Sequence, residues 1–222
     1  MKLKNKIIIA IDGPAGSGKS SVSKIVAKRL GLLYIDTGAM YRALTLKAME
    51  KSINLEEETA LVELAHNTKI ELIHKEEGTV VLLDEQDVTE KIRETDVTNN
   101  VFYLARAEGV RECMKKLQRK IAEKGNVVME GRDITTVILP DADYKFYLDA
   151  SFEERVKRRR KELEQNGRQV VESGLSKDIK TRDKKDLTRK IAPLRKARDA
   201  IVIDSTGMSL EEETETVISY IK

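Results

Sequence analysis

Short apolar runs alternate with amphipathic segments over most of this chain, a pattern that predicts an α/β protein with a parallel sheet. The first run, residues 6–12, is β-branched and almost continuously apolar, as expected for a buried strand. Apolar residues then recur at helical spacing from Val22 to Leu30, and Gly31 supplies a stop signal. Further strands are predicted at residues 32–36, 127–129, 144–148 and 200–204, and further helices at 39–51, 97–124 and 209–222.

Residues 53–95 do not follow this alternation of buried strands and amphipathic helices. Polar and apolar side chains alternate there as in half-buried antiparallel strands. An antiparallel patch within a parallel α/β chain indicates an inserted subdomain. Whether that subdomain only supports the core or moves with a substrate stays open. Its predicted elements are a helix at 55–65, strands at 69–74 and 79–83 joined by a turn at 76–78, and a third short strand within 84–89.

Basic residues are concentrated between residues 155 and 198. Ser151 and Glu154 form a capping box that predicts the start of a helix. This helix leads into a polar turn at 165–168, and a second basic helix is predicted from Ser176 to about Ala200. Two basic helices joined by a polar turn suit a lid, because arginines that close over a transferring phosphoryl group stabilise the charge on its oxygens.

A phosphate-binding motif lies between the first strand and the first helix. Residues 13–20, Gly-Pro-Ala-Gly-Ser-Gly-Lys-Ser, match the pattern G-x-x-x-x-G-K-[ST] in the strand-to-helix context that it requires. Glycine tolerates positive φ, so backbone N–H groups can converge there on an anion. We expect Lys19 to reach the β- and γ-phosphates of a nucleotide and the Ser20 hydroxyl to ligate Mg²⁺.

Polar residues also follow two other predicted strands. In open parallel sheets ligands bind beyond the carboxyl ends of the strands, which is where these residues fall. Thr37 is a candidate helix N-cap as well as a candidate ligand group. Arg42 is suited to a bidentate phosphate contact. Glu130 closes a buried strand and is a candidate to bind Mg²⁺ through water.

Composition narrows the classes of function. With 222 residues, 40% of them hydrophobic, the chain can bury one core plus a small insert. The net charge of +3 does not argue for nucleic acid, and no apolar run reaches membrane-spanning length. Cys113 is the only cysteine, which suits a reducing cytoplasm, and no signal-peptide pattern precedes the phosphate loop. The two histidines and one cysteine give no zinc spacing, which leaves Mg²⁺ as the expected metal.

Five segments together resemble the bacterial cytidylate kinases, and the resemblance covers essentially the whole chain. The phosphate loop alone is generic, but the pattern D-[ST]-G-A-x-Y-R combined with G-R-D and R-D-x-x-D-x-x-R is specific to that family. The segments are IDGPAGSGKSS (11–21), IDTGAMYR (35–42), EGRD with T-x-x-x-P-D-A (130–142), S-x-E-E-R-x-x-R-R (151–159), and R-D-x-x-D-x-x-R with APL (182–194).

The resemblance implies transfer of the γ-phosphoryl group of ATP to CMP or dCMP with Mg²⁺. It implies a phosphate-loop kinase fold, with a five-stranded parallel sheet, flanking helices, an inserted antiparallel subdomain and a helical lid. One domain would span residues 1–222. It would comprise a core (about 1–52, 96–154 and 199–222), a substrate-binding insert (about 53–95) and a lid (about 155–198). The protein would be cytoplasmic and monomeric, with no nucleic-acid or membrane partner.

The resemblance also implies roles for individual residues. ATP would be held by Gly13, Pro14, Ala15, Gly16, Ser17, Gly18, Lys19, Ser20 and Ser21. Mg²⁺ would be bound directly by Ser20, and through water by Asp36 and Glu130. The acceptor would be bound by Thr37, Arg111 and Asp133 near the base, Tyr41 beside the nucleoside, Arg182 and Asp186 at the ribose, and Arg42, Arg132 and Arg189 on the phosphate. Catalysis would fall to Lys19, Arg132, Arg189 and the lid arginine Arg158.

Two positions depart from the family pattern. Thr135 stands where a glycine is common, so the local backbone is expected to differ. Phe102 aligns with a serine that faces the base, and losing that hydroxyl is expected to weaken discrimination against uracil, unless Phe102 is simply a core residue.

Three other functions are alternatives to this one. Another nucleoside monophosphate kinase would differ only in its acceptor. A GTP-dependent switch protein would need an N-K-x-D motif, which the chain lacks. A nucleic-acid-dependent ATPase that used residues 155–198 would need aromatic residues for base stacking, and none is interleaved there.

Overall fold

The computed structural model describes residues 6–75, 78–165 and 172–221. The chain divides into two compact units. One comprises residues 1–32 and 126–222, and the other comprises residues 33–125. The predicted boundaries of core, insert and lid stay a prediction.

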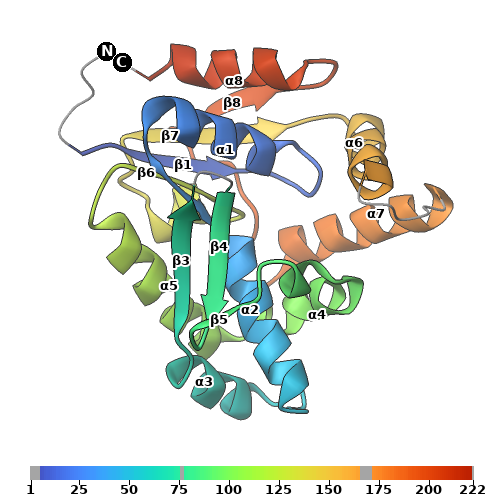
Figure 1. The fold of residues 1–222 in the computed structure, drawn as a ribbon. Helices are drawn as coiled ribbons and strands as arrows, with labels where there is room; N and C mark the ends of the chain where they lie inside the picture. The colour runs from blue at the N-terminus through green and yellow to red at the C-terminus, as the bar shows by residue number, and fades with distance from the viewer. Residues whose placement is uncertain (1–5, 76–77, 166–171, 222) are drawn as a thin grey trace. The chain divides into compact units, whose positions relative to one another are not determined.

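A five-stranded sheet runs in the order β2-β6-β1-β7-β8 (Figure 1). Its central strand β1 pairs in parallel with β6 on one side and with β7 on the other, and β8 pairs in parallel with β7. Ile9, Ala10 and Ile11 of β1 are completely buried, which is why the sequence has no polar residue at these positions. The predicted parallel α/β fold is confirmed. The strands are β1 (Ile8–Asp12), β2 (Leu33–Asp36), β6 (Val127–Gly131), β7 (Tyr144–Asp149) and β8 (Ile201–Asp204).

The helices of the first unit form two packed pairs. The helix α1 (Lys19–Leu30) contacts β6 and the last helix, α8 (Leu210–Ser219). The helices α6 (Phe152–Gln165) and α7 (Glu172–Thr188) contact each other (Figure 1). Val156, Leu175 and Ile179 form an apolar cluster between them. Both helices of the expected lid therefore share a small apolar core. A π-helical turn, η2 (Ile134–Ile138), follows β6 and contacts β1.

The second unit combines a three-stranded antiparallel sheet with helices. Its sheet has the order β3-β4-β5, and Leu72 of β3 pairs with Val81 of β4. This confirms the antiparallel patch that the alternating pattern predicts; residues 76–77 of its expected turn lie outside the described residues. The elements after β2 are α2 (Thr37–Glu50), α3 (Glu58–His66), β3 (Ile70–Lys75), β4 (Gly78–Leu83), β5 (Gln86–Asp87), η1 (Lys91–Arg93), α4 (Thr95–Arg106) and α5 (Glu108–Ala122).

The single helix predicted at 97–124 is wrong. The structure has two helices, α4 and α5, separated by Ala107 in an extended conformation (φ −71°, ψ 118°). Leu104 and Val110 are both completely buried. They are six residues apart, and an unbroken helix would place them about 120° apart around its axis. Breaking the helix lets both side chains reach the apolar interior.

The predicted end of the second basic helix is also wrong. Helix α7 stops at Thr188 rather than near Ala200. Ala192, directly before Pro193, has φ 48°. The residue before a proline is disfavoured in the α-helical region, so the chain cannot continue as a helix there. The start of α7 at Glu172 is four residues earlier than expected, and most of the predicted polar turn at 165–168 lies outside the described residues.

Gly13 gives a test of how the phosphate loop packs against the sheet. A Cβ atom at Gly13 would lie 2.1 Å from the carbonyl oxygen of Leu148 in β7. Because that neighbour is backbone in the middle of the sheet, we expect Gly13→Ala to lower the free energy of unfolding by at least about 1–3 kcal/mol. Urea denaturation measures this.

Gly174 in α7 is the matched control. A Cβ atom there would meet nothing within 4 Å, so Gly174→Ala is expected to be neutral, or stabilising by about 0.5–1 kcal/mol. A Gly13→Ala protein that unfolds at the same urea concentration as the parent would show that the loop is not packed on β7 as described.

Candidate active site

The phosphate loop connects β1 to α1 with two glycines in the left-handed region. Gly16 has φ 76° and Gly18, the residue before α1, has φ 87°. No side chain caps this helix start within the described part of the chain, and its first turn contains no acidic residue. The N–H groups of the first turn and their partial positive charge are therefore available to an anion.

Lys19, Ser20 and Glu130 lie together at this helix start. The Lys19 side chain is buried and its Nζ donates to the carbonyl oxygen of Pro14 at 3.2 Å. The Nζ atom lies 4.0 Å from Oε2 of Glu130, and the Ser20 hydroxyl donates to Oε1 of the same carboxylate at 2.6 Å. One buried acid at the end of β6 therefore holds both of the loop residues that are predicted to act on the nucleotide.

The charged form of Lys19 is destabilised, because the carboxylates around its ammonium group do not offset burial and the nearby arginines. Burial lowers the pKa of Lys19 to about 7, repulsion from Arg132 and Arg182 adds to this, and Glu130 and Asp186 oppose it only in part. A buried cation in this state gains from an anion placed beside it. The electrostatics of the loop therefore favour a polyphosphate as its ligand.

The residues around Ser20 fit Mg²⁺ of the kind held mainly by substrate. Among the described residues, no group of three or more His, Cys, Asp or Glu side chains could hold a metal ion. Mg²⁺ commonly uses one or two protein groups together with phosphate oxygens and water. The hydroxyl of Ser20 beside the carboxylate of Glu130 supplies such a pair. Asp36, the third predicted Mg²⁺ residue, belongs to the second unit.

Two ion pairs connect the loop after β6 with the end of α7. Nε of Arg132 donates to Oδ2 of Asp186 at 2.7 Å, and a terminal nitrogen of Arg189 donates to Oδ1 of Asp133 at 3.1 Å. Burial alone would raise the pKa of Asp186, but Arg132 and Arg182 outweigh it and hold that pKa below its ordinary value. The structure therefore brings together five of the predicted acceptor residues in one charged cluster.

Asp12 is a site residue that the sequence analysis did not single out. Its carboxylate, at the end of β1, accepts hydrogen bonds from the backbone N–H groups of Ile134 and Thr135 and from the Thr135 hydroxyl. These bonds fix the start of η2, directly after Arg132 and Asp133. An acid that ends a buried strand just before the phosphate loop was the available signal.

Thr135 occupies the place of the common family glycine without strain. Its φ is not positive, so the position does not require glycine. Its hydroxyl donates to Oδ2 of Asp12 at 2.6 Å, a contact that glycine cannot make. Thr135 thus adds a hydrogen bond at this position, and the expected difference of the local backbone from that of the family stays a prediction.

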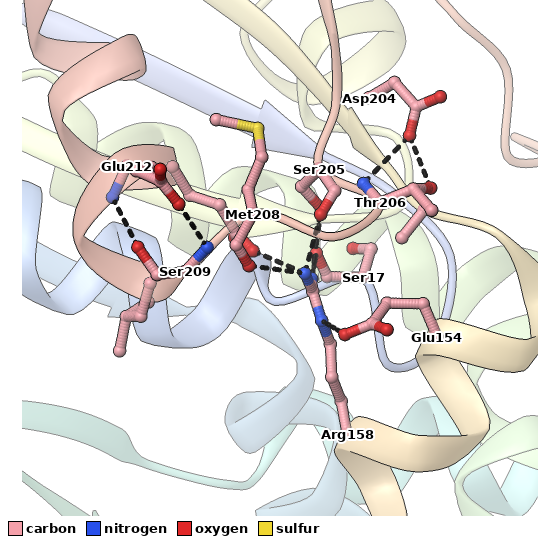
Figure 2. A network of polar contacts seen from close by, with 12 residues as sticks. Ser17, Glu154, Arg158, Asp204, Ser205, Thr206, Met208, Ser209 and Glu212 are labelled. Atoms are coloured by element: carbon pink, nitrogen blue, oxygen red, sulfur yellow. Dashed lines mark hydrogen bonds and ion pairs between the residues drawn. The ribbon is translucent and has the colours of Figure 1, made fainter.

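Arg158 points its guanidinium group at the outside of the phosphate loop (Figure 2). It donates to the carbonyl oxygen of Ser17 at 3.3 Å and to the hydroxyl and carbonyl oxygens of Ser205 at 3.0 and 2.7 Å. Glu154, from the same helix, and Glu213, from α8, balance its charge. In this structure Arg158 ties α6 to the phosphate loop and to the loop before α8. Its predicted role on the transferring phosphoryl group stays a prediction.

In the second unit, Asp36 rather than Thr37 caps α2. The Asp36 carboxylate accepts from the backbone N–H of Ala39 at 2.9 Å, and Thr37 is the first residue of the helix. The prediction of Thr37 as N-cap is therefore wrong; its proposed contact with a base is a separate matter and stays a prediction. Arg42 pairs with the same carboxylate at 2.9 Å, and its charge holds the pKa of Asp36 below the ordinary value despite burial.

The remaining predicted residues of the second unit lie on three helices. Tyr41 is half-buried on α2, and Arg111 is buried on α5, where it donates to the carbonyl oxygen of Ala105 at 3.3 Å. Phe102 is half-buried on α4, with its ring edge-to-face with Tyr103 and the Arg106 guanidinium 5.5 Å from the ring centre. Phe102 is therefore not part of the fully buried core, and its effect on base selection stays a prediction.

The parallel sheet has the phosphate loop at the end of its central strand, and arginines held in ion pairs with carboxylates lie in the same unit. Together these features define a phosphate-loop phosphotransferase. The family model described as Cytidylate kinase matches residues 9–222. The chain belongs to the cytidylate kinase family.

Full-length relatives agree with this assignment. The cytidylate kinase of Desulforamulus reducens is 52% identical over 214 residues, which cover 96% of each chain. The cytidylate kinase of Bacillus subtilis is 46% identical over 220 residues, which cover 99% of this chain and 98% of the relative.

A solved structure shows the same fold. An uncharacterized protein from Eubacterium ventriosum aligns with a TM-score of 0.52 and 19% identity, over 97% of this chain and 98% of its own. In the part of the chain that the structure describes, no helix is both long enough and apolar enough to cross a membrane.

The bond between Thr135 and Asp12 predicts a pH-dependent cost of substitution. Burial raises the pKa of Asp12 to about 6, although the bonds from Thr135 and Ile134 oppose this rise. Above pH 6 the carboxylate is ionised, and a bond to a charged group contributes about 1.5–3 kcal/mol, against about 0.5–1.5 kcal/mol for a neutral one. We therefore expect Thr135→Val to destabilise the protein more at pH 8 than at pH 5, as measured by urea denaturation.

Thr136→Val is the matched control. The Thr136 hydroxyl is buried and has no hydrogen-bond partner among the described residues, so its removal is expected to cost little at either pH. An equal loss for Thr135→Val at pH 5 and pH 8 would contradict the assignment of this bond to an ionising Asp12.

Proposed function

We propose that this chain transfers the γ-phosphoryl group of ATP to CMP, and also to dCMP, with Mg²⁺. The observation that carries the proposal is membership of the cytidylate kinase family over residues 9–222. The site within the first unit supports it, because a phosphate loop and a cluster of arginines are what a donor and an acceptor phosphate each require. A switch protein would need the first of these and has no use for the second.

ATP is proposed to bind at residues 13–21, with its phosphates at the start of α1. The N–H groups of that helix start and the ammonium group of Lys19 face the charge that spreads over the transferring oxygens. The ion bound by Ser20, and by Glu130 and Asp36 through water, would neutralise part of the charge on the phosphate oxygens. Lys19 gains from this arrangement, because a bound polyphosphate supplies negative charge that offsets its burial and the nearby arginines.

The acceptor phosphate is proposed to bind Arg132, Arg189 and Arg42. Each of these arginines already contacts one carboxylate in the structure: Asp186, Asp133 and Asp36 respectively. A phosphate dianion offers two charges in a geometry that matches a guanidinium fork, so it competes with a single carboxylate. An acceptor oxygen held by these arginines attacks the γ-phosphorus as the bond to ADP breaks.

Recognition of cytosine is proposed to rest on hydrogen-bond acceptors. The 4-amino group of cytosine is a donor, and the Thr37 hydroxyl and the Asp133 carboxylate can accept from it. Arg111 and Tyr41 complete the nucleoside contacts, and Arg182 and Asp186 bind the ribose. Residues 155–198 are proposed to act as the lid, with Arg158 reaching the nucleotide when the lid closes. A cytoplasmic monomer without nucleic-acid or membrane partners remains the expectation.

A coupled assay with ATP and each of CMP, UMP, AMP and GMP tests the acceptor. We expect the largest kcat/KM for CMP.

Lys19→Met is expected to lower kcat by about a hundredfold or more with the fold intact, because a fixed positive charge acts where transition-state charge develops.

Two results would count against the proposal. Preferred turnover of another monophosphate would identify a different nucleotide kinase. Near-parental kcat in a folded Lys19→Met protein would remove the phosphate loop from the reaction.

A further inference from the structure

Arg155 lies in the first turn of α6 and is almost entirely buried, with 8% of its surface exposed. One of its terminal nitrogens donates to the carbonyl oxygen of Ala15 in the phosphate loop at 2.9 Å, and also to Oδ2 of Asp183 in α7 at 2.6 Å. Its Nε donates to the carbonyl oxygen of Ala150 at 3.2 Å. One side chain thus joins three segments, and the phosphate loop lies 140 residues away from it in sequence.

The bond to Ala15 sets the direction of a peptide group in the phosphate loop. A trans peptide points its C=O and N–H in opposite directions. Holding the Ala15 carbonyl toward Arg155 therefore turns the N–H of Gly16 to the other side, toward the expected phosphates. The backbone is fixed closely here, because a Cβ atom at Gly16 would lie 2.9 Å from the carbonyl oxygen of Arg155.

Asp183 links this arginine to the charged cluster on α7. It is followed three residues later by Asp186, and residues at this spacing are neighbours on a helix surface. Asp186 pairs with Arg132, while Asp183 pairs with Arg155. One face of α7 thus holds two ion pairs, one directed to the loop after β6 and one directed to the phosphate loop. The second oxygen of Asp183, Oδ1, is buried without a hydrogen-bond partner among the described residues, so the carboxylate depends on Arg155.

We propose that Arg155 and Asp183 form a positioning pair that couples acceptor binding on α7 to the orientation of the phosphate loop. The proposal rests on the function proposed above, in which Arg182 and Asp186 contact the acceptor. Acceptor binding fixes α7, Asp183 then fixes Arg155, and Arg155 fixes the Ala15–Gly16 peptide in its phosphate-binding direction. Coupling between two ligands is reciprocal, so ATP strengthens CMP binding by the same factor.

The test measures how much one ligand strengthens binding of the other. The measured quantity is the ratio of a ligand's dissociation constant without the second ligand to its dissociation constant with the second ligand bound. Calorimetry measures binding of a non-hydrolysable ATP analogue with and without CMP, and of CMP with and without the analogue, always with Mg²⁺. We expect the parent ratio to be about fivefold or more, within the range of ordinary coupling between sites. In Asp183→Asn the ratio is expected to fall toward one, with the binary constants within about twofold of the parent, the scatter expected at a site remote from the ligand.

Asp178→Asn is the matched control. It makes the same chemical change on the same helix at an exposed position, and it should keep the parent ratio. Arg155→Gln removes the other member of the pair and is expected to lower the ratio in the same way. It replaces Asp183→Asn in the test if that variant does not fold. The double variant should lose no more coupling than either single variant, because the two residues act as one unit.

Three results would overturn the proposal: a parent ratio of one, a parental ratio in folded Asp183→Asn or Arg155→Gln protein, or additive losses in the double variant. A failure of the proposed function is distinguishable, since it appears as a lack of CMP phosphorylation by the parent and by Asp178→Asn.

Discussion

The phosphate loop is enclosed from outside by three other elements, and the rest of the site depends on this packing. Gly13 lies against the backbone of β7, Gly16 against the backbone of α6, and Gly18 against Glu213 of α8 and Arg158 of α6. Side chains at these positions would meet atoms closer than 3 Å in each case. The glycines therefore allow close packing on the outer side of the loop as well as dihedral freedom.

Several cations of the first unit are each paired with a carboxylate, and an anionic ligand can take the place of that carboxylate. Lys19 faces Glu130, Arg132 faces Asp186, and Arg189 faces Asp133. Pairing compensates the charge of Arg132 and Arg189, because an uncompensated charge away from water is strongly unfavourable. For Lys19 the compensation is only partial. The ion pairs also limit which ligands can bind, since a ligand must offer more charge or better geometry than the carboxylate that it displaces. Phosphate dianions and polyphosphates meet that condition.

The sequence predicts the parts of this fold that depend on local pattern. The five parallel strands, the antiparallel patch and the phosphate loop follow from apolar runs, alternation and glycine spacing. The break at Ala107 was missed because it depends on which buried side chains must share an interior, and local propensity does not carry that information. The end of α7 was missed although Pro193 is a local signal that a helix does not continue to Ala200.

The candidate site shows the same division. Lys19, Ser20 and the arginine cluster are visible as motifs, whereas the contacts of Asp12 with η2 and of Arg155 with Ala15 join residues more than a hundred positions apart. Asp36 was expected as a ligand of Mg²⁺ through water, and only the structure shows that it also caps α2 and holds Arg42. Patterns indicate the chemistry of such residues, but tertiary contacts decide which partners they have.

The most direct test of the central claim concerns two peptide groups of the phosphate loop. Arg155 and Arg158 hold the carbonyl oxygens of Ala15 and Ser17 from outside, so the N–H groups of Gly16 and Gly18 point away from these arginines, to the side where we propose that ATP binds. Amide NMR spectra recorded with and without ATP and Mg²⁺ measure this. The amide protons of both glycines should move downfield on binding, as expected for N–H groups that donate to phosphate oxygens, while that of Gly207 should stay unchanged. Saturating ATP that leaves the amide signals of both loop glycines unmoved would contradict the account.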